Sequence, residues 1–197
     1  SLLANLIQTP SLMERAQQGR EVGYAIIAVG IIAVIFAFYK LYSLYMIGTA
    51  VRKQAGQKAA DPSNPLGRVL KVGKDNFDKD IDTLELKLAE AIMAERPAID
   101  QGIGFIKIIS VIAPLAGLLG TVTGMIVTFQ MITLYGTGDP KLMAGGISQA
   151  LVTTVLGLLV AIPTSLLHSF TQSSARGIIS ILEEQSTGIL AERAESK

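Results

Sequence analysis

The side chains best able to order water or guide an ion in this sequence are polar but uncharged, and they lie inside long apolar stretches. They are four hydroxyls and one amide: Thr121, Thr128, Gln149, Thr153 and Thr154. A hydroxyl can both donate and accept a hydrogen bond, but it does not take up a full charge. The central parts of the apolar stretches contain no Asp, Glu, Lys, Arg or His, whereas a proton pump needs a group that binds and releases a charge at membrane depth. The chain therefore either does not conduct, or lines an ion path with these five residues while a partner supplies the titrating group.

Small residues recur at helical spacing in the same two stretches. One stripe has steps of 4, 3, 1, 3 and 4 residues: Ala113, Gly117, Gly120, Thr121, Gly124 and Thr128. The other has steps of 4, 3, 4 and 4: Ala150, Thr154, Gly157, Ala161 and Ser165. Small residues let membrane helices approach closely, so the stripes predict either helix packing or a conduction surface, and both readings stay open. Pro114 and Pro163 each free a backbone carbonyl one turn earlier, which permits local hydration.

The composition is that of a membrane protein. Half of the 197 residues are hydrophobic, 17% are charged and the mean hydropathy is +0.47. A net charge of +1 gives no electrostatic case for a nucleic-acid partner. The absence of cysteine excludes disulfides and thiolate metal sites. We expect no cofactor, no metal and no enzymatic activity, because no segment gathers a nucleophile, a base or metal ligands. The single histidine, His168, is expected at the wet edge of a span, with a pH gate as the alternative.

Three segments are long enough to span a bilayer, which takes about 20 apolar residues. The loop between the first two carries nine Lys and Arg residues, whereas the connection between the last two has only Lys141. Because positively charged loops stay inside, we predict an outward N-terminus and an inward C-terminus. The predicted segments are a periplasmic amphipathic connector (1–21), the first span (22–47), a cytoplasmic helical segment (48–102), the second span (103–136), a periplasmic turn (137–146), the third span (147–173) and a cytoplasmic C-terminal helix (174–197).

Details of the first span and of the long loop complete the predicted all-α fold. The first span lacks a polar stripe, so we expect it to face lipid on the outside of the assembly, with Lys40 reaching water from near its end. In the loop, Asn64-Pro65 indicates a helix start. Apolar residues at steps of 3 or 4 from Phe77 to Ile92 then predict an amphipathic helix over 66–95 that Pro97 ends. We expect the C-terminal helix to pack against it.

Two blocks of the sequence resemble the MotA/TolQ/ExbB proton channel family. They are the runs APLAGLLGTVTGM at 113–125 and GISQALVTTVLGLLVAIP at 146–163. Three spans with a cytoplasmic segment of modest size look like the ExbB and TolQ branch, and the pattern is most similar to ExbB-type members. The resemblance covers the second and third spans strongly and the rest of the chain in topology only.

The resemblance implies a function, an assembly and two site residues. It implies a bacterial inner-membrane, multi-pass homopentamer around an ExbD-like single-span subunit, which carries the conducting aspartate. Such a stator uses the proton-motive force to energise TonB-dependent transport, with a TonB-like transducer as a further partner. Thr121 and Thr154 match threonines of the family pattern and are then expected to face the pore.

The match has two departures, and several alternatives stay open. Many ExbB and TolQ chains have tryptophan where Thr123 stands. Many ExbB chains have glutamate where Gln149 stands, so a proton-relay role for that position is in doubt. A TolQ-like or gliding-motor stator is one alternative, and a non-conducting membrane scaffold is another. Threonine-lined paths also occur in sodium-driven members, so the driving ion stays open.

Overall fold

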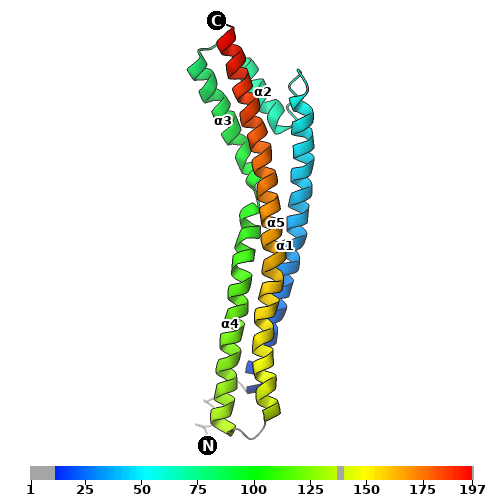
Figure 1. Ribbon diagram of the computed structural model, residues 1–197, viewed down its shortest axis with the longest axis vertical. Coiled ribbons are helices and arrows are strands. Elements are labelled where there is room, and N and C mark those ends of the chain that lie inside the picture. Colours follow the sequence, from blue (N-terminus) through cyan, green and yellow to red (C-terminus); the bar gives the residue numbers. More distant parts are fainter. Residues whose placement is uncertain (1–11, 137–139, 197) are drawn as a thin grey trace, which may run out of the picture. The chain divides into compact units, whose positions relative to one another are not determined.

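The computed structural model describes residues 12–136 and 140–196, and all regular secondary structure within these residues is helical. The helices are α1 (Leu12–Ala55), α2 (Pro65–Asp75), α3 (Ile81–Asp100), α4 (Ile103–Tyr135) and α5 (Pro140–Glu195) (Figure 1). Three segments are long and apolar enough to cross a membrane: Glu21–Ala55, Ile103–Tyr135 and Met143–Glu195. The predicted all-α fold with three spanning helices is confirmed. The first eleven residues of the predicted N-terminal connector lie outside the described residues.

The helices form two compact units, which are described separately. The hairpin unit consists of Ser1–Ile35 and Phe105–Leu166, and the four-segment unit of Phe36–Gly104 and Leu167–Lys197. The hairpin unit contains nearly all of α4 together with the first parts of α1 and α5. The four-segment unit contains α2, α3 and the second parts of α1 and α5.

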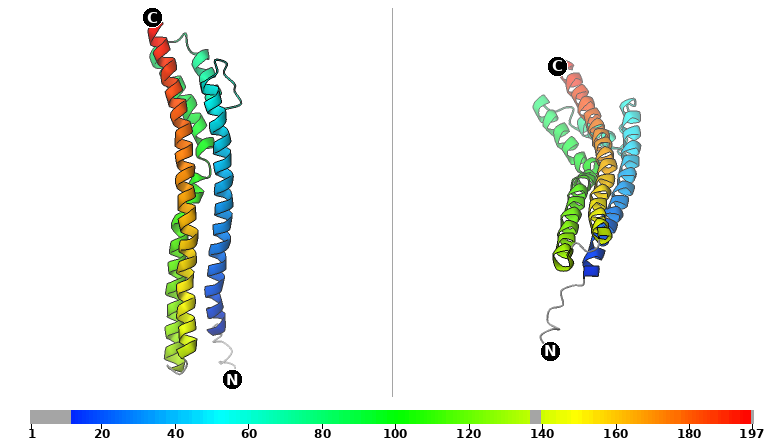
Figure 2. Two further views of the ribbon diagram at one scale, coloured as in Figure 1. Left: turned by 45° about the vertical axis from the view of Figure 1, so that its right-hand side comes forward. Right: turned by 60° about the horizontal axis from the view of Figure 1, so that its bottom comes forward.

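In the hairpin unit, α4 and α5 lie side by side (Figures 1 and 2). The α5 helix begins at Pro140, so residues 140–146 of the predicted turn are helical, while 137–139 lie outside the described residues. Proline suits the first position of a helix, because its fixed φ is helical and no backbone N–H is lost there. The connection between the two helices is therefore shorter than the sequence pattern predicted.

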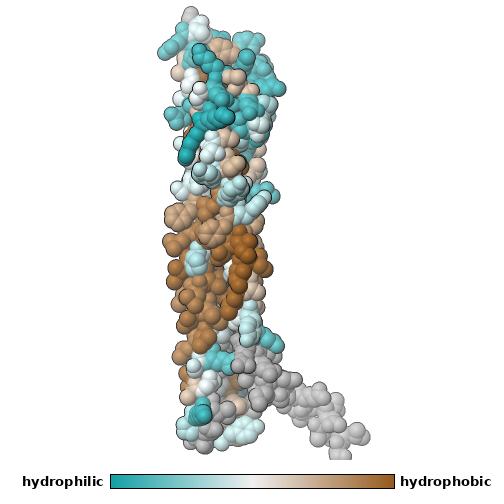
Figure 3. Space-filling view, turned by 90° about the vertical axis from the view of Figure 1, so that its right-hand side faces the viewer, coloured by the Kyte–Doolittle hydropathy of each residue, from teal (hydrophilic) through white to brown (hydrophobic). Residues whose placement is uncertain are grey.

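The first span packs against α5 with a buried stripe of mostly small residues, which the sequence pattern did not indicate. Within the hairpin unit this stripe is buried at steps of 3, 4 and 3: Gly23, Ile26, Gly30 and Ala33. A Cβ at Gly30 would collide with the side chain of Val160. Bulky residues such as Ile32 and Ile35 are exposed, and the space-filling view shows a broad hydrophobic surface (Figure 3). That this helix faces lipid on the outside of the assembly stays a prediction, and its contact with α5 is close.

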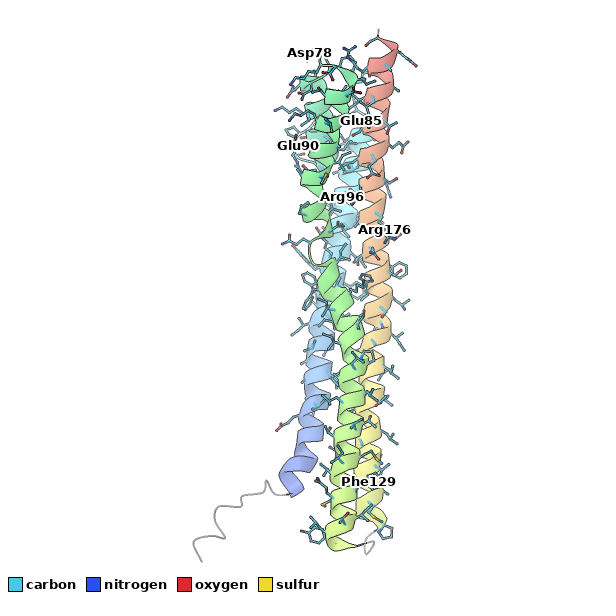
Figure 4. The ribbon with its side chains drawn as sticks, turned by 90° about the vertical axis from the view of Figure 1, so that its left-hand side faces the viewer. Asp78, Glu85, Glu90, Arg96, Phe129 and Arg176 are labelled. Atoms are coloured by element: carbon cyan, nitrogen blue, oxygen red, sulfur yellow. The ribbon has the colours of Figure 1, made fainter. Side chains whose placement is uncertain are left out.

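The four-segment unit is organised around an aliphatic core. Its largest fully buried side chains include one or more from each of its four helices: Leu44, Val51, Leu66, Val69, Leu84, Leu88 and Leu182. Hydrophilic side chains lie outside this core; Asp78, Glu85 and Glu90 are exposed (Figure 4). Two ion pairs join helices at the surface, Arg68 with Glu95 at 2.7 Å and Arg96 with Glu183 at 3.0 Å. The predicted packing of the C-terminal helix against the loop helices is confirmed.

The predicted helix over 66–95 is two helices. The start at Asn64-Pro65 is confirmed, since the Asn64 side chain accepts a hydrogen bond from Gly67 N at 2.8 Å. However, α2 ends at Asp75, and α3 begins after Asp80, whose carboxylate accepts from Thr83 N at 2.9 Å. An N-cap carboxylate stabilises a new helix start, which is why the apolar periodicity does not continue as one helix through Phe77.

Buried polar groups stabilise the connections of this unit. Lys40 is only 6% exposed and donates to the Ala98 carbonyl at 3.3 Å, so it binds the end of α3 instead of reaching water as predicted. Pro97 lies inside α3 and does not end it. At the end of α1, the buried Gln54 side chain accepts a hydrogen bond from Asp61 N, in the loop before α2, at 2.9 Å. The backbone N–H of Ser63 holds the pKa of the Asp61 carboxyl below its usual value.

Candidate ion-pathway site

The candidate site lies where glycines bring the backbones of α4 and α5 into contact. A Cβ at Gly117 would lie 2.8 Å from the Thr153 carbonyl oxygen, and one at Gly157 would lie 2.6 Å from the Ala113 carbonyl oxygen. Real Cβ atoms do not approach backbone so closely, so these positions need glycine for this packing. At this separation a short hydroxyl side chain of one helix reaches the backbone of the other.

Thr121 of α4 and Thr154 of α5 meet across this contact. Their hydroxyls are hydrogen-bonded to each other, and either one can be the donor. Thr121 Oγ1 lies 3.1 Å from the Ala150 carbonyl and 3.3 Å from that of Gly117, and Thr154 Oγ1 lies 3.2 Å from the Gly117 carbonyl. Both side chains are half-buried. The structure therefore brings together the two threonines that the sequence singled out, although they lie 33 residues apart.

Thr153 completes this cluster from a buried position. It is 2% exposed, and its hydroxyl lies 2.7 Å from the Ala150 carbonyl and 3.2 Å from that of Gly117. A Cβ at Gly120 would lie 2.5 Å from Thr153 Oγ1, so this glycine makes room for the side chain. Three hydroxyls thus share two backbone carbonyls. The sequence signal for this residue is that Thr153 directly precedes Thr154. Spacing alone does not show that Thr153 faces α4.

The two other predicted polar residues lie apart from the pair. Thr128 is 5% exposed, donates to the Gly124 carbonyl at 2.9 Å and fills the space above Gly146. Gln149 is half-buried and lines a cavity of about 190 Å³ with α1 residues such as Tyr24. Pore lining by Thr128, Gln149 and Thr153 stays a prediction. Thr128 and Thr153 are buried within one chain, which favours packing roles for both.

Of the residues predicted to pack closely, Ala113, Gly117, Gly120, Gly124 and Gly157 lie at the α4–α5 contact. Those of the predicted residues that are buried share small side chains: Ala113, Gly117, Gly120, Gly157 and Ala161. Gly124 is half-buried, and a Cβ there would lie 2.7 Å from the Cβ of Ala150. Pro114 and Pro163 are half-buried inside continuous helices. The two stripes therefore face each other within one chain.

The electrostatic character of the site follows from what its helices lack. Residues 108–134 and 142–166 contain no ionisable side chain. The site therefore presents only neutral hydroxyl and carbonyl oxygens, which orient water or a neighbouring acid but do not store a proton. Nor do any three His, Cys, Asp or Glu side chains in the described ranges lie close enough to hold a metal ion.

Comparison with known proteins identifies the family. A sequence model described as the MotA/TolQ/ExbB proton channel family matches residues 61–184. The chain belongs to this family. The match to the MotA/TolQ/ExbB family includes α2, α3, α4 and most of α5, and so contains the whole α4–α5 contact.

Several relatives in this family carry the name ExbB. The chain is 31% identical over 180 residues to a putative biopolymer transport protein ExbB homolog of Methanothermobacter thermautotrophicus, covering 81% of the chain and 62% of the relative. It is 36% identical over 102 residues to putative biopolymer transport protein ExbB-like 3 of Synechocystis, covering 51% and 49%. It is 38% identical over 90 residues to biopolymer transport protein exbB1 of Vibrio cholerae, covering 44% and 38%. The chain thus spans less than two thirds of the length of each of these relatives.

Proposed function

We propose that this chain is an ExbB-like stator subunit of a motor driven by the proton-motive force, which energises TonB-dependent transport across the outer membrane. Family membership and the ExbB names of several relatives support this proposal. The proposed partners are an ExbD-like single-span subunit that carries the conducting aspartate and a TonB-like transducer. No cofactor takes part.

The observation that carries the proposal is the Thr121–Thr154 hydroxyl pair, which lies in the charge-free parts of α4 and α5 (residues 108–134 and 142–166). A carboxylate crossing the hydrocarbon region is costly unless hydrogen-bond donors meet it. The half-buried pair offers such a donor, and it offers an acceptor when the acid is protonated. The chain itself has no group there that competes for the proton, so charge transfer stays with the partner's acid.

The proposed arrangement follows the sequence prediction. Five copies surround the partner's helices in a bacterial inner membrane, with Thr121 and Thr154 facing the central pore. The N-terminus and residues 137–146 lie on the periplasmic side, and residues 48–102 and 174–197 lie in the cytoplasm. The Lys and Arg residues of the 48–102 segment support this orientation. The sequence prediction also includes Thr128, Thr153 and Gln149 in the pore lining, although the burial of Thr128 and Thr153 favours packing roles for these two.

A non-conducting scaffold is the second candidate, and one observation favours it. The small-residue stripes pack against each other within one chain, so helix packing explains them without any pore. The scaffold reading does not explain why the paired hydroxyls stay half-buried. A TolQ-like or gliding-motor stator shares the site and differs only in the transducer that it drives.

The experiment replaces the hydroxyls by methyl groups of similar shape. We expect Thr121→Val or Thr154→Val to abolish TonB-dependent uptake in cells, because the partner's carboxylate loses its donor, while native mass spectrometry still detects the assembly. Thr133→Val is the matched control on α4, since the Thr133 hydroxyl is exposed and donates to the Phe129 carbonyl of its own helix. Normal uptake in either pair variant would contradict the pore-facing assignment. A purified protein with no single-span partner and no proton flux would favour the scaffold.

A further inference from the structure

The three hydroxyls of the cluster have as many hydrogens as there are places inside the hairpin to accept them. In a regular α-helix the Gly117 carbonyl accepts the N–H of Thr121, and the Ala150 carbonyl accepts the N–H of Thr154. Each carbonyl oxygen then keeps one lone pair for a further donor. Three hydroxyl hydrogens are available to these two positions and to the bridge between Thr121 and Thr154.

The distances decide which hydroxyl takes which carbonyl. The shortest hydroxyl–carbonyl contact is from Thr153 Oγ1 to the Ala150 carbonyl at 2.7 Å. Thr121 reaches that same carbonyl only at 3.1 Å. Because hydrogen bonds weaken as the distance grows, Thr153 holds the Ala150 carbonyl. The pair then keeps only the Gly117 carbonyl, at 3.3 Å from Thr121 and 3.2 Å from Thr154.

We propose that Thr153 is a positioning residue for the ion pathway: by occupying the Ala150 carbonyl, it leaves one hydroxyl hydrogen of the Thr121–Thr154 pair available to an acceptor outside the chain. One hydrogen forms the bridge between the two hydroxyls. The other hydrogen makes only a long hydrogen bond to the Gly117 carbonyl, so pointing it out of the hairpin costs little free energy. Thr153 acts through the pair, because it is itself buried. This inference rests on the proposed function, in which a carboxyl of the partner faces the pair.

Removing the Thr153 hydroxyl has a predictable consequence for that carboxyl. Without Thr153, the Thr121 hydroxyl donates to the Ala150 carbonyl instead, and the hydrogen of Thr154 forms the bridge to Thr121. Both hydrogens are then held inside the hairpin. A hydrogen bond to a carboxylate favours the charged form, so its loss raises the pKa of the partner's acid. The pH at which proton flux is half-maximal then moves upward.

The test measures proton flux against pH in proteoliposomes that contain the complex purified with its single-span partner. We expect Thr153→Val to raise the midpoint by roughly half to one pH unit, the equivalent of one hydrogen bond of ordinary strength. Thr153→Ser keeps the hydroxyl and should restore the midpoint. Thr164→Val is the matched control, because Thr164 is also fully buried in α5 and donates to Val160 and Ala161 of its own helix. It should lower thermal stability as Thr153→Val does, with the midpoint unchanged.

Each outcome separates this inference from the proposed function. An unmoved midpoint in Thr153→Val, or an equal shift in Thr164→Val, would overturn the positioning role even if total flux falls. If the unaltered complex conducts and Thr121→Val stops it, the proposed function stands whatever Thr153 does. If the unaltered complex shows no partner-dependent flux, the proposed function fails and the inference fails with it.

Discussion

The hairpin unit and the four-segment unit are both helical, but different contacts stabilise them. In the hairpin unit, glycines bring α4 and α5 into backbone contact, as Gly117 and Gly157 show, and hydroxyls bond across the gap. In the four-segment unit, large aliphatic side chains such as Leu84 and Leu182 fill the space between helices, and capping residues and ion pairs surround them. The hairpin unit packs through glycines, which have no side chain, and the four-segment unit packs through large aliphatic side chains.

The difference is expected if, as proposed, the hairpin unit lies in lipid and the four-segment unit in water. Lipid tails are as apolar as leucine, so burying leucine between membrane helices gains little, and close packing with hydrogen bonds must hold them together. In water, removing aliphatic surface is the main favourable contribution to folding. The two units should therefore respond oppositely to substitution: the hairpin unit should suffer from added atoms, and the four-segment unit from removed atoms.

The largest expected effect comes from removing bulk in the four-segment unit. Leu84 is fully buried in the aliphatic core, so Leu84→Ala should lower the free energy of unfolding by about 2–5 kcal/mol. Leu86 lies on the same helix and is 71% exposed, so Leu86→Ala is the matched control and should change it by less than about 0.5 kcal/mol. Denaturant titration in detergent measures both. Equal effects of the two variants would show that the core is not where the structure places it.

A smaller effect is expected from adding one methyl group to the hairpin unit. Gly157→Ala places a Cβ 2.6 Å from the Ala113 carbonyl oxygen, so the helices must separate, at a cost of about 1–3 kcal/mol. Gly188→Ala is the control on the same helix, because nothing lies within 4 Å of its new Cβ. Replacing that helical glycine should stabilise the protein by about 0.5–1 kcal/mol. The comparison between the units would be refuted if Gly157→Ala also raised the thermal midpoint in detergent.

The sequence predicted the features that depend on long apolar runs and on helical periodicity. The three spanning helices and the small-residue stripes of α4 and α5 follow from composition and spacing. The family pattern then singled out Thr121 and Thr154, which the structure brings together. The helix start at Pro65 was also predictable, since Asn64 is a good N-cap and proline suits the first helical position.

The remaining features depend on which of several possible hydrogen-bond partners a polar group takes, and a sequence pattern does not reveal this. The aliphatic periodicity from Phe77 to Ile92 predicted one helix, but the Asp80 cap starts a new one. Lys40 lies near the end of an apolar run, where snorkelling is usual, yet the Ala98 carbonyl holds it inside. Thr153 lies next to Thr154 in the sequence, and only the hairpin geometry shows that it shares carbonyl acceptors with the pair.

The most direct test of the central claim asks whether the hydroxyl pair borders water or lipid. The chain contains no cysteine, so a single cysteine introduced into it is the only thiol of this subunit. A small charged thiol reagent needs a hydrated thiolate to react. In the assembled complex in vesicles, we predict that Thr154→Cys is modified and that Leu159→Cys, on the exposed apolar side of the same helix, is not. An unreactive Thr154→Cys beside a reactive Leu159→Cys would contradict the account.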